Sequence, residues 1–212
     1  MTVELRPMTE KDFPKIESII KSSWRYEDFC SPKVANKLAK SFLAGCLTDY
    51  TDSQVAIVNN KLVAVIFLKN NAIHRTPFKY RLKQLKTMIS MMLNKEARNV
   101  ASVFSYVEVI DKKLLKEAGH DYAGELSLFA VDETCQGQGV GKKLFQYAMT
   151  TFQEQQVDNF YLYTDTTCNY GFYDYHGMTK RAEMVHHFTQ LAGVEPTTFF
   201  LYDYDFKQKD AD

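Results

Sequence analysis

The sequence lacks a hydrophobic run long enough to cross a bilayer. Its longest apolar stretch, Leu62–Leu68, is far shorter than the roughly 20 residues that a membrane-spanning helix needs. The first twenty residues carry charges throughout, which does not fit the apolar segment of a secretory signal. These absences predict a cytoplasmic protein that has no membrane as a partner.

The sequence has few cysteines, and their spacing matches neither a C-x-x-C pair nor a zinc site. The cysteines are Cys30, Cys46, Cys135 and Cys168. They form no C-x-x-C pair and no zinc-like spacing with the histidines. We therefore expect reduced thiols and no bound metal.

The sequence also lacks an excess of either charge and any linker-like or low-complexity tract. Lys and Arg number 26, as do Asp and Glu, so the chain as a whole has no positive field for a phosphate backbone. Nucleic acid is accordingly not an expected partner. With 212 residues and no dividing linker, we expect residues 1–212 to form a single domain.

Hydrophobic periodicity predicts a mixed order of strands and helices. An N-terminal strand and two helices precede a hairpin, whose strands meet at Asn59-Asn60. A helical pair follows at about 78–119, with the first helix expected at about 78–97 and the second ending at Gly119. The later strands are expected at Glu125–Val131, Asn159–Thr164, Lys180–Phe188 and Thr197–Tyr204, with one helix after the first of them and a short helix at Tyr170–Tyr175.

The helical pair carries an apolar stripe. Leu82, Met88, Ile89 and Met92 recur at helical spacing. Such a stripe is typical of the seam between two packed helices. The alternative is that these side chains line a pocket for a longer acyl group or a non-amine acceptor.

Three glycines, Gly137, Gly139 and Gly141, lie between a predicted apolar strand and a predicted amphipathic helix. The first N–H groups of a helix have no partner within it, and the helix dipole is positive at that end. Because glycine has no Cβ, an anion can approach this backbone closely, and Lys142 and Lys143 add positive charge. The turn therefore predicts a diphosphate site.

Two common nucleotide motifs do not match these letters. The dinucleotide fingerprint requires Gly where Lys142 stands. The P-loop requires Gly at Gln136 and Ser or Thr at Lys143. A plain strand-to-helix connection stays the alternative to a cofactor turn.

On these residues the sequence resembles the GNAT superfamily of N-acetyltransferases. The family's pyrophosphate signature, Q/R-x-x-G-x-G/A, is matched by Gln136, Gly139 and Gly141. A second family feature is a short helix in which a Tyr is followed by Gly and an apolar residue. The segment at 172–178 resembles it, with Met178 in place of the usual Phe.

The resemblance implies an α/β (α+β) fold: a mixed central sheet of about seven strands flanked by helices. The predicted order of elements is the family's order, except at about 78–119. There the helical pair would be an insertion before the fourth strand, where most members have a short connection.

The resemblance also implies acetyl-coenzyme A as the cofactor. Backbone groups of the central strand would pair with the pantetheine arm like an added strand, and the glycine turn would hold the pyrophosphate. A polar residue before the short helix would also contact the cofactor. The residues implied are Ala130, Val131, Gln136, Gly137, Gln138, Gly139, Val140, Gly141, Lys142 and Asn169.

Transfer to an amine needs a base, because deprotonating an amine of pKa about 10.4 at pH 7 costs about 4.6 kcal/mol. Glu125 opens the central strand, and some protein-lysine acetyltransferases of the family resemble it in carrying a catalytic Glu at this offset from the turn. We expect Glu125 to be the base, directly or through water. An exposed strand-end carboxylate is the alternative, and Asp132 and Asp165 are weaker candidates.

The resemblance assigns Tyr173 to the departing thiolate. A thiol pKa near 8.5 lies about 1.5 units below that of a phenol, so we expect a stabilising hydrogen bond rather than full proton transfer. The alternative is a core tyrosine packed among Phe172 and Tyr175.

Together these residues predict direct transfer of acetyl to a primary amine of a small molecule or peptide. The alternatives are an acyl-CoA-binding module without turnover, an acyltransferase for longer acyl groups, or a covalent route through Cys135 or Cys168. The acceptor and the oligomeric state do not follow from the sequence, and a homodimer formed through an edge strand stays open.

Overall fold

The computed structural model describes residues 2–188 and 195–209, except for the side chains of residues 102–104, 208 and 209. The strands are β1 (Glu4–Pro7), β2 (Asp52–Val58), β3 (Lys61–Asn70), β4 (Gly124–Val131), β5 (Asn159–Asp165), β6 (Thr179–His186) and β7 (Thr197–Asp205). In the described part they form one sheet in the order β1-β2-β3-β4-β5-β7-β6. The predicted mixed sheet of about seven strands is confirmed.

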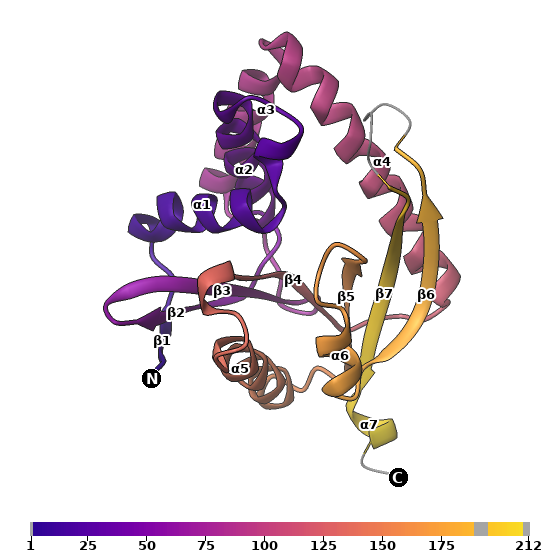
Figure 1. Cartoon of the computed structure of the whole chain (residues 1–212). Coiled ribbons are helices and arrows are strands. Elements are labelled where there is room, and N and C mark those ends of the chain that lie inside the picture. Colours follow the sequence, from indigo (N-terminus) through magenta and orange to yellow (C-terminus); the bar gives the residue numbers. More distant parts are fainter. Residues whose placement is uncertain (1, 189–194, 210–212) are drawn as a thin grey trace.

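Helices cover both faces of this sheet (Figure 1). They are α1 (Phe13–Ser23), α2 (Pro32–Cys46), α3 (Phe78–Met92), α4 (Lys95–Ala118), α5 (Val140–Glu154), α6 (Gly171–Tyr175) and α7 (Phe206–Lys209). Single 3-10 turns, η1 (Glu10–Asp12), η2 (Tyr26–Asp28) and η3 (Glu133–Cys135), join some of them. The sequence patterns did not predict α7.

The hairpin between β2 and β3 turns where predicted. Asn59 and Asn60 both adopt positive φ, at 48° and 61°. Two consecutive left-handed residues match the twist of antiparallel strands and make a tight two-residue connection. The hairpin fixes β3 beside the position that β4 takes later in the chain.

The parallel strands β4 and β5 pair only at their beginnings. Gly124 lies opposite Phe160 and Glu125 lies opposite Tyr161, and no later pair joins the two strands. Opposite β3, the register jumps from Leu126 to Leu128, so Ser127 is an extra residue on β4. Such a bulge increases strand twist, which is consistent with β4 turning away from β5 beyond Glu125.

Two apolar cores lie on opposite faces of this sheet. One joins α1 and α2 to Leu128 and Ala130 of β4. The other joins α5 and α6 to Leu126 of the same strand. Because successive strand residues point to opposite faces, Glu125 lies on the face that α1, α2 and α4 cover.

The helical insertion is present, but its helices break earlier than the sequence pattern suggested. The apolar pattern carried the first helix to about residue 97, whereas α3 ends at Met92 and α4 begins at Lys95. Asn94 causes the break, because its side-chain oxygen accepts a hydrogen bond from the N–H of Ala97 at 2.9 Å. Gly119, at φ 65°, ends α4 as predicted.

This cap gives a stability prediction. Substituting Asn94→Ala leaves the Ala97 N–H without its acceptor, and we expect the free energy of unfolding to fall by about 1 kcal/mol. Urea denaturation measures the difference. The exposed α4 residue Lys113 supplies the control, since Lys113→Ala removes no cap. Equal stability of the two variants would contradict the assignment of Asn94 as the cap.

The predicted seam between the two inserted helices is wrong. The helix α3 packs chiefly on α2, and its buried residues are Tyr80, Thr87 and Met91. The residues of the predicted seam are largely exposed, at 43% for Leu82, 52% for Met88, 48% for Ile89 and 66% for Met92. The long helix α4 instead crosses to β6 and β7, away from α3 (Figure 1).

Candidate active site

The glycine turn connects β4 to α5 through η3 and has the backbone that its sequence predicts. Gly137 and Gly139 adopt φ of 72° and 80°, and Gly139 is the N-cap residue of α5. A Cβ at either position would meet no atom within 4 Å, so the space beside this backbone is open. The first N–H groups of α5 point out of its N-terminus into that space, as an anion site requires.

Side chains around the turn hold it in place. Gln138 donates to the carbonyl of Thr134 at 2.8 Å, and Lys143 donates to the carbonyl of Val3. Gln136 lies 3.4 Å from the carbonyl of Val131. Lys142 is exposed at the first turn of α5, where its charge adds to the dipole.

Ala130 and Val131 lie on the part of β4 that β5 leaves uncovered. On its other side β4 pairs with β3, where Ala64 lies opposite Val131 and Val65 opposite Ala130. No described strand pairs with β4 on the β5 side beyond Glu125. This edge can therefore accept an extended ligand through backbone hydrogen bonds.

The short helix α6 lies against the start of α5. A Cβ on Gly141 would approach the Phe172 ring at 3.8 Å, and the rings of Phe145 and Phe172 lie 5.5 Å apart. The fold thus brings the two sequence motifs together. Asn169 is exposed two residues before α6, and its carbonyl accepts from the Phe172 N–H at 3.2 Å.

Tyr173 is 9% exposed and packs near Phe145 and Tyr202. Burial, together with the nearby Cys168, raises the pKa of its phenol above the ordinary value. A phenol with a raised pKa stays protonated, so it can donate a hydrogen bond but is a weaker acid. These contacts also fit the alternative of a packed core tyrosine.

Glu125 stands at the point where β4 and β5 separate. Its side chain is only 14% exposed. Lys69, its partner on the adjacent strand β3, places its Nζ 3.7 Å from the Glu125 carboxylate. Lys69 is closer to Asp49, at 2.7 Å. Burial raises the pKa of the Glu125 carboxyl, although the charge of Lys69 opposes that effect. An exposed strand-end carboxylate, the alternative interpretation, does not describe this residue.

A second carboxylate, Asp111 on α4, faces the same region and was missed by the sequence analysis. Val107, Leu114 and Leu115, which lie on the same face of α4 at helical spacing, pack with the cluster that contains Tyr161. Burial is the largest cause, and together with the charges of Glu125, Asp165 and Glu108 it raises the pKa of Asp111 to about 7.

The groups that interact electrostatically with Asp111 come from three elements. They are Glu108 on α4, Glu125 on β4, and Asp165 and Tyr163 on β5. Among the described residues, no hydrogen bond or ion pair compensates the Asp111 carboxylate, while Arg181 of β6 is paired with Asp203. The helical spacing of Asp111 with its apolar neighbours is the sequence signal that could have identified it.

Asp132, one of the weaker candidates for the base, differs from Glu125 and Asp111. Asp132 lies 2.9 Å from Lys15 and accepts from Thr134, which lowers the pKa of its carboxyl. Such a carboxylate is a weaker base than Glu125.

Burial raises the pKa of the Cys168 thiol, which reduces its thiolate fraction and does not favour a covalent route.

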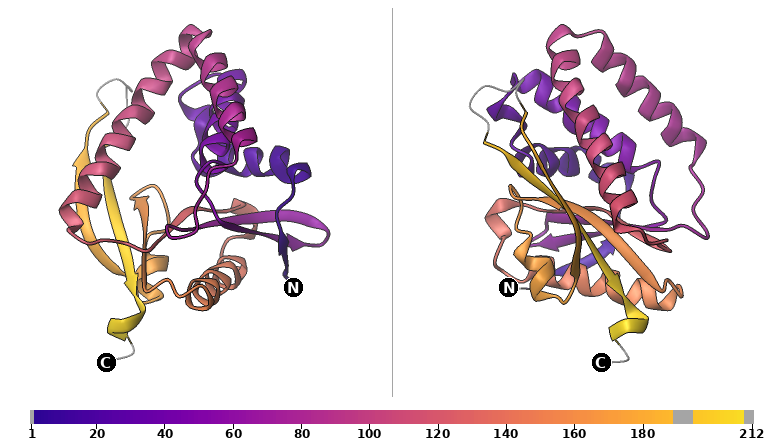
Figure 2. Two further views of the ribbon diagram at one scale, coloured as in Figure 1. Left: turned by 180° about the vertical axis from the view of Figure 1, so that it is seen from behind. Right: turned by 90° about the vertical axis from the view of Figure 1, so that its right-hand side faces the viewer.

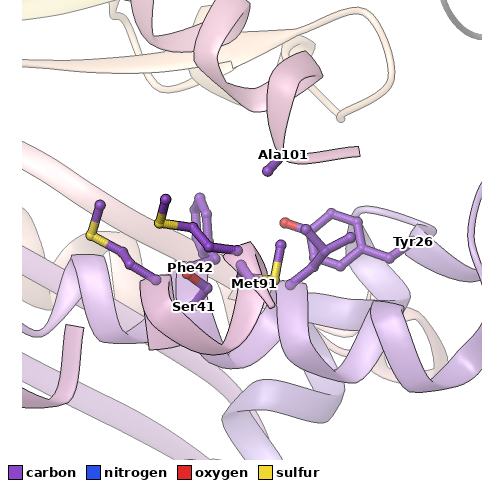
Figure 3. Close-up of a pocket in the computed structure, with 8 residues that line it drawn as sticks. Tyr26, Ser41, Phe42, Met91 and Ala101 are labelled. Carbon is purple, nitrogen blue, oxygen red and sulfur yellow. The ribbon is translucent and has the colours of Figure 1, made fainter. Parts of the chain in front are cut away.

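A separate apolar cavity lies between α2, α3 and the start of α4 (Figure 3). Its volume is about 280 Å³. Its lining residues are Tyr26, Leu38, Ser41, Phe42, Met88, Met91, Met92 and Ala101. Of the predicted pocket residues, Met88 and Met92 contribute to it, whereas Leu82 and Ile89 do not.

Among the described residues, no helix is both long and apolar enough to span a membrane. In the same part of the chain, no three or more His, Cys, Asp or Glu side chains are placed so that they could hold a metal ion.

Solved structures with this fold come from several organisms. Ard1 from Thermoplasma volcanium has 13% identity and a TM-score of 0.57, over 97% of this chain and 98% of that one. An N-acetyltransferase from Staphylococcus aureus Mu50 has 9% identity and a TM-score of 0.56, over 97% and 99%. The PaiA N-acetyltransferase from Thermoplasma acidophilum, in complex with coenzyme A, has 13% identity and a TM-score of 0.50, over 97% and 100%. At these identities the likeness establishes the fold.

A search of curated protein sequences found no match. The model of the acetyltransferase (GNAT) family matches residues 55–178, which include β4, the glycine turn, α5 and α6. That match covers more than half of the chain. The chain therefore belongs to the GNAT family of N-acetyltransferases, enzymes that use acetyl-coenzyme A.

Proposed function

We propose that this enzyme transfers acetyl directly to a primary amine of a small molecule or peptide, with Glu125 and Asp111 together removing the proton of the amine. The observation that carries the proposal is the position of Glu125. It lies at the end of the paired part of β4 and β5, directly before the uncovered edge of β4. A cofactor arm on that edge would lead toward a desolvated carboxylate pair.

The residues around the turn and the β4 edge fit coenzyme A. Positive φ at Gly137 and Gly139 leaves open space beside the N–H groups of α5, which suits a diphosphate. The backbone of Ala130 and Val131 suits the amide groups of pantetheine. We assign binding to these residues and to Gln136, Gln138, Val140, Gly141, Lys142 and Asn169. When bound, the cofactor supplies an activated acetyl thioester.

The two carboxylates suit an amine that arrives protonated. Burial raises the pKa of both carboxyls, and the charge of Glu125 raises that of Asp111 further, to about 7, so Asp111 holds a proton near neutral pH. An ammonium group replaces that proton as the compensating positive charge. Its own proton then passes to a carboxylate whose pKa lies near the working pH, where general bases are most effective.

Tyr173 is proposed to donate a hydrogen bond to the sulfur that leaves. We expect Tyr173→Phe to lower kcat about 10- to 100-fold while the Kd for acetyl-CoA changes little, because the bond would matter only as negative charge develops. Steady-state kinetics and calorimetry separate the two constants. Tyr170→Phe, a matched change one residue before α6, should leave kcat near the wild-type value. An unchanged kcat in Tyr173→Phe would mean that Tyr173 is a packed core residue and not a donor to the leaving sulfur.

The proposed function is tested by thiol release from acetyl-CoA across a panel of small amines, polyamines and peptides, with product mass as confirmation. We expect CoA release that depends on an amine and yields the N-acetyl product. Tight acetyl-CoA binding without turnover on any acceptor would favour the non-catalytic binding module. Faster turnover with a longer acyl-CoA than with acetyl-CoA would favour an acyltransferase for longer acyl groups.

A further inference from the structure

We propose that the solvent-facing side of α3 is a docking surface for an anionic lipid membrane. This surface is defined by Phe78, Leu82, Leu85, Met88, Ile89, Met92 and Leu93, together with Arg81 and Lys86. The proposal is independent of the acetyl-transfer chemistry. It replaces the expectation of no membrane partner, which rested on the absence of a spanning segment. A helix that lies in the membrane surface needs none.

The first observation is an apolar stripe that the fold leaves uncovered. Phe78, Leu82, Leu85, Ile89 and Met92 follow one another at intervals of four, three, four and three residues, so they share one side of α3. With Met88 and Leu93 they are 43% to 82% exposed. Monomeric proteins rarely expose contiguous apolar patches of this kind without a use for them.

The opposite side of α3 is already occupied. Tyr80, Thr87 and Met91 are buried, and Lys37 of α2 donates to the carbonyl of Ser90 at 3.0 Å. Figure 2 shows α3 on the outside of α2 in the view from behind. The stripe therefore faces away from the core, and the partner that covers it must come from outside the described fold.

The second observation is the charge around the stripe. The helix α3 carries four Lys and Arg and no Asp or Glu, although Lys79 is paired with Glu10 and Lys83 lies over the Phe13 ring. Arg81 and Lys86 flank the stripe on its two sides, and no ion-pair partner is found for either among the described residues. This asymmetry is local, because the whole chain has no net charge. A basic helix with a wide apolar side is the pattern of a surface that binds anionic lipid.

A second copy of the chain fits this surface less well. Two α3 helices would bring Arg81 and Lys86 of each copy together, and like charges beside a helix seam oppose pairing. A helix of 15 residues is about 22 Å long and offers a strip far below the roughly 800 Å² per partner of a stable interface. A lipid surface needs no such complementary area.

The test is co-sedimentation of the full chain with vesicles of phosphatidylglycerol and phosphatidylcholine, and with vesicles of phosphatidylcholine alone. We expect binding to the anionic vesicles that weakens at high salt. The double variant Leu85→Glu/Ile89→Glu and the charge variant Arg81→Glu/Lys86→Glu should each weaken binding at least about tenfold. The control is Val185→Glu, at a valine of β6 that is 63% exposed, and it should bind like the wild type.

Three results would overturn the proposal. One is no binding to anionic vesicles by a folded wild-type chain. A second is binding that Leu85→Glu/Ile89→Glu leaves unchanged. The third comes from light scattering: a dimer that this double variant converts to a monomer would assign the surface to a second copy instead. Circular dichroism checks that each variant is folded. We expect folded variants, because all four altered residues of α3 are exposed.

Discussion

The variant Gly139→Glu is expected to bind acetyl-CoA at least about 100-fold more weakly than the wild type, which corresponds to about 2.7 kcal/mol. Gly139 combines a φ of 80° with open space beside the first turn of α5. A glutamate there places negative charge where the diphosphate would lie and fills the approach to the helix N–H groups. Isothermal titration with acetyl-CoA measures the loss.

Backbone strain is the competing explanation of such a loss, and Gly119→Glu controls for it. Gly119 also has positive φ, at 65°, and is exposed at the end of α4. Both substitutions should cost about 1–2 kcal/mol of stability for the left-handed backbone. We expect Gly119→Glu to keep its acetyl-CoA affinity. Equal loss in both variants would mean that strain, and not the site, weakens binding.

The variant Glu125→Gln is expected to lower kcat/KM about 100- to 10,000-fold while acetyl-CoA binding persists, as loss of a general base requires. Asp111→Asn should reduce it less, because Glu125, which lies directly before the uncovered edge of β4, remains. In this variant Asp111, the carboxyl with a pKa of about 7, no longer titrates, and Glu125 alone does. The rise of kcat/KM with pH would then move to lower pH in Asp111→Asn. Glu117→Gln, at an exposed glutamate of α4 that does not act on Asp111 or Glu125, is the matched control.

Asp111 should also affect stability, and the sign follows from its raised pKa. Between pH 4 and about 7 the unfolded chain releases the Asp111 proton while the folded chain retains it, so the free energy of unfolding falls as pH rises. The variant Asp111→Asn removes this cost, and we expect it to be about 1–3 kcal/mol more stable than the wild type at pH 7 and nearly equal at pH 4. Equal thermal stability at both pH values would contradict a desolvated Asp111.

The order of strands and the backbone of the glycine turn could be predicted because their signals are local. The Asn59-Asn60 turn, the glycines and the apolar strand of β4 each depend on neighbours in sequence. The family's signatures place Gly139 and Tyr173 in the same way. The structure adds that Gly141 and Phe172 lie together, which the separate motifs could not show.

The parts that could not be predicted depend on tertiary packing. Periodicity identified the stripe on α3 but could not tell a buried side from an exposed one, so Leu82 and Ile89 were placed in a seam. Asp111 was missed because its spacing with apolar neighbours on α4 indicates a buried side of the helix but not which groups that side meets. Its character comes from the crossing of α4 over β6 and β7, which brings it toward Glu125.

The fate of the acetyl group in a single turnover tests the account most directly. The enzyme would be mixed with limiting acetyl-CoA labelled in the acetyl group and with an amine found in the panel, then quenched and analysed by mass spectrometry. Direct transfer predicts that the label passes to the amine and that the protein, including Cys135 and Cys168, never carries it. A protein-bound acetyl group that forms without the amine and disappears when the amine is added would contradict direct transfer.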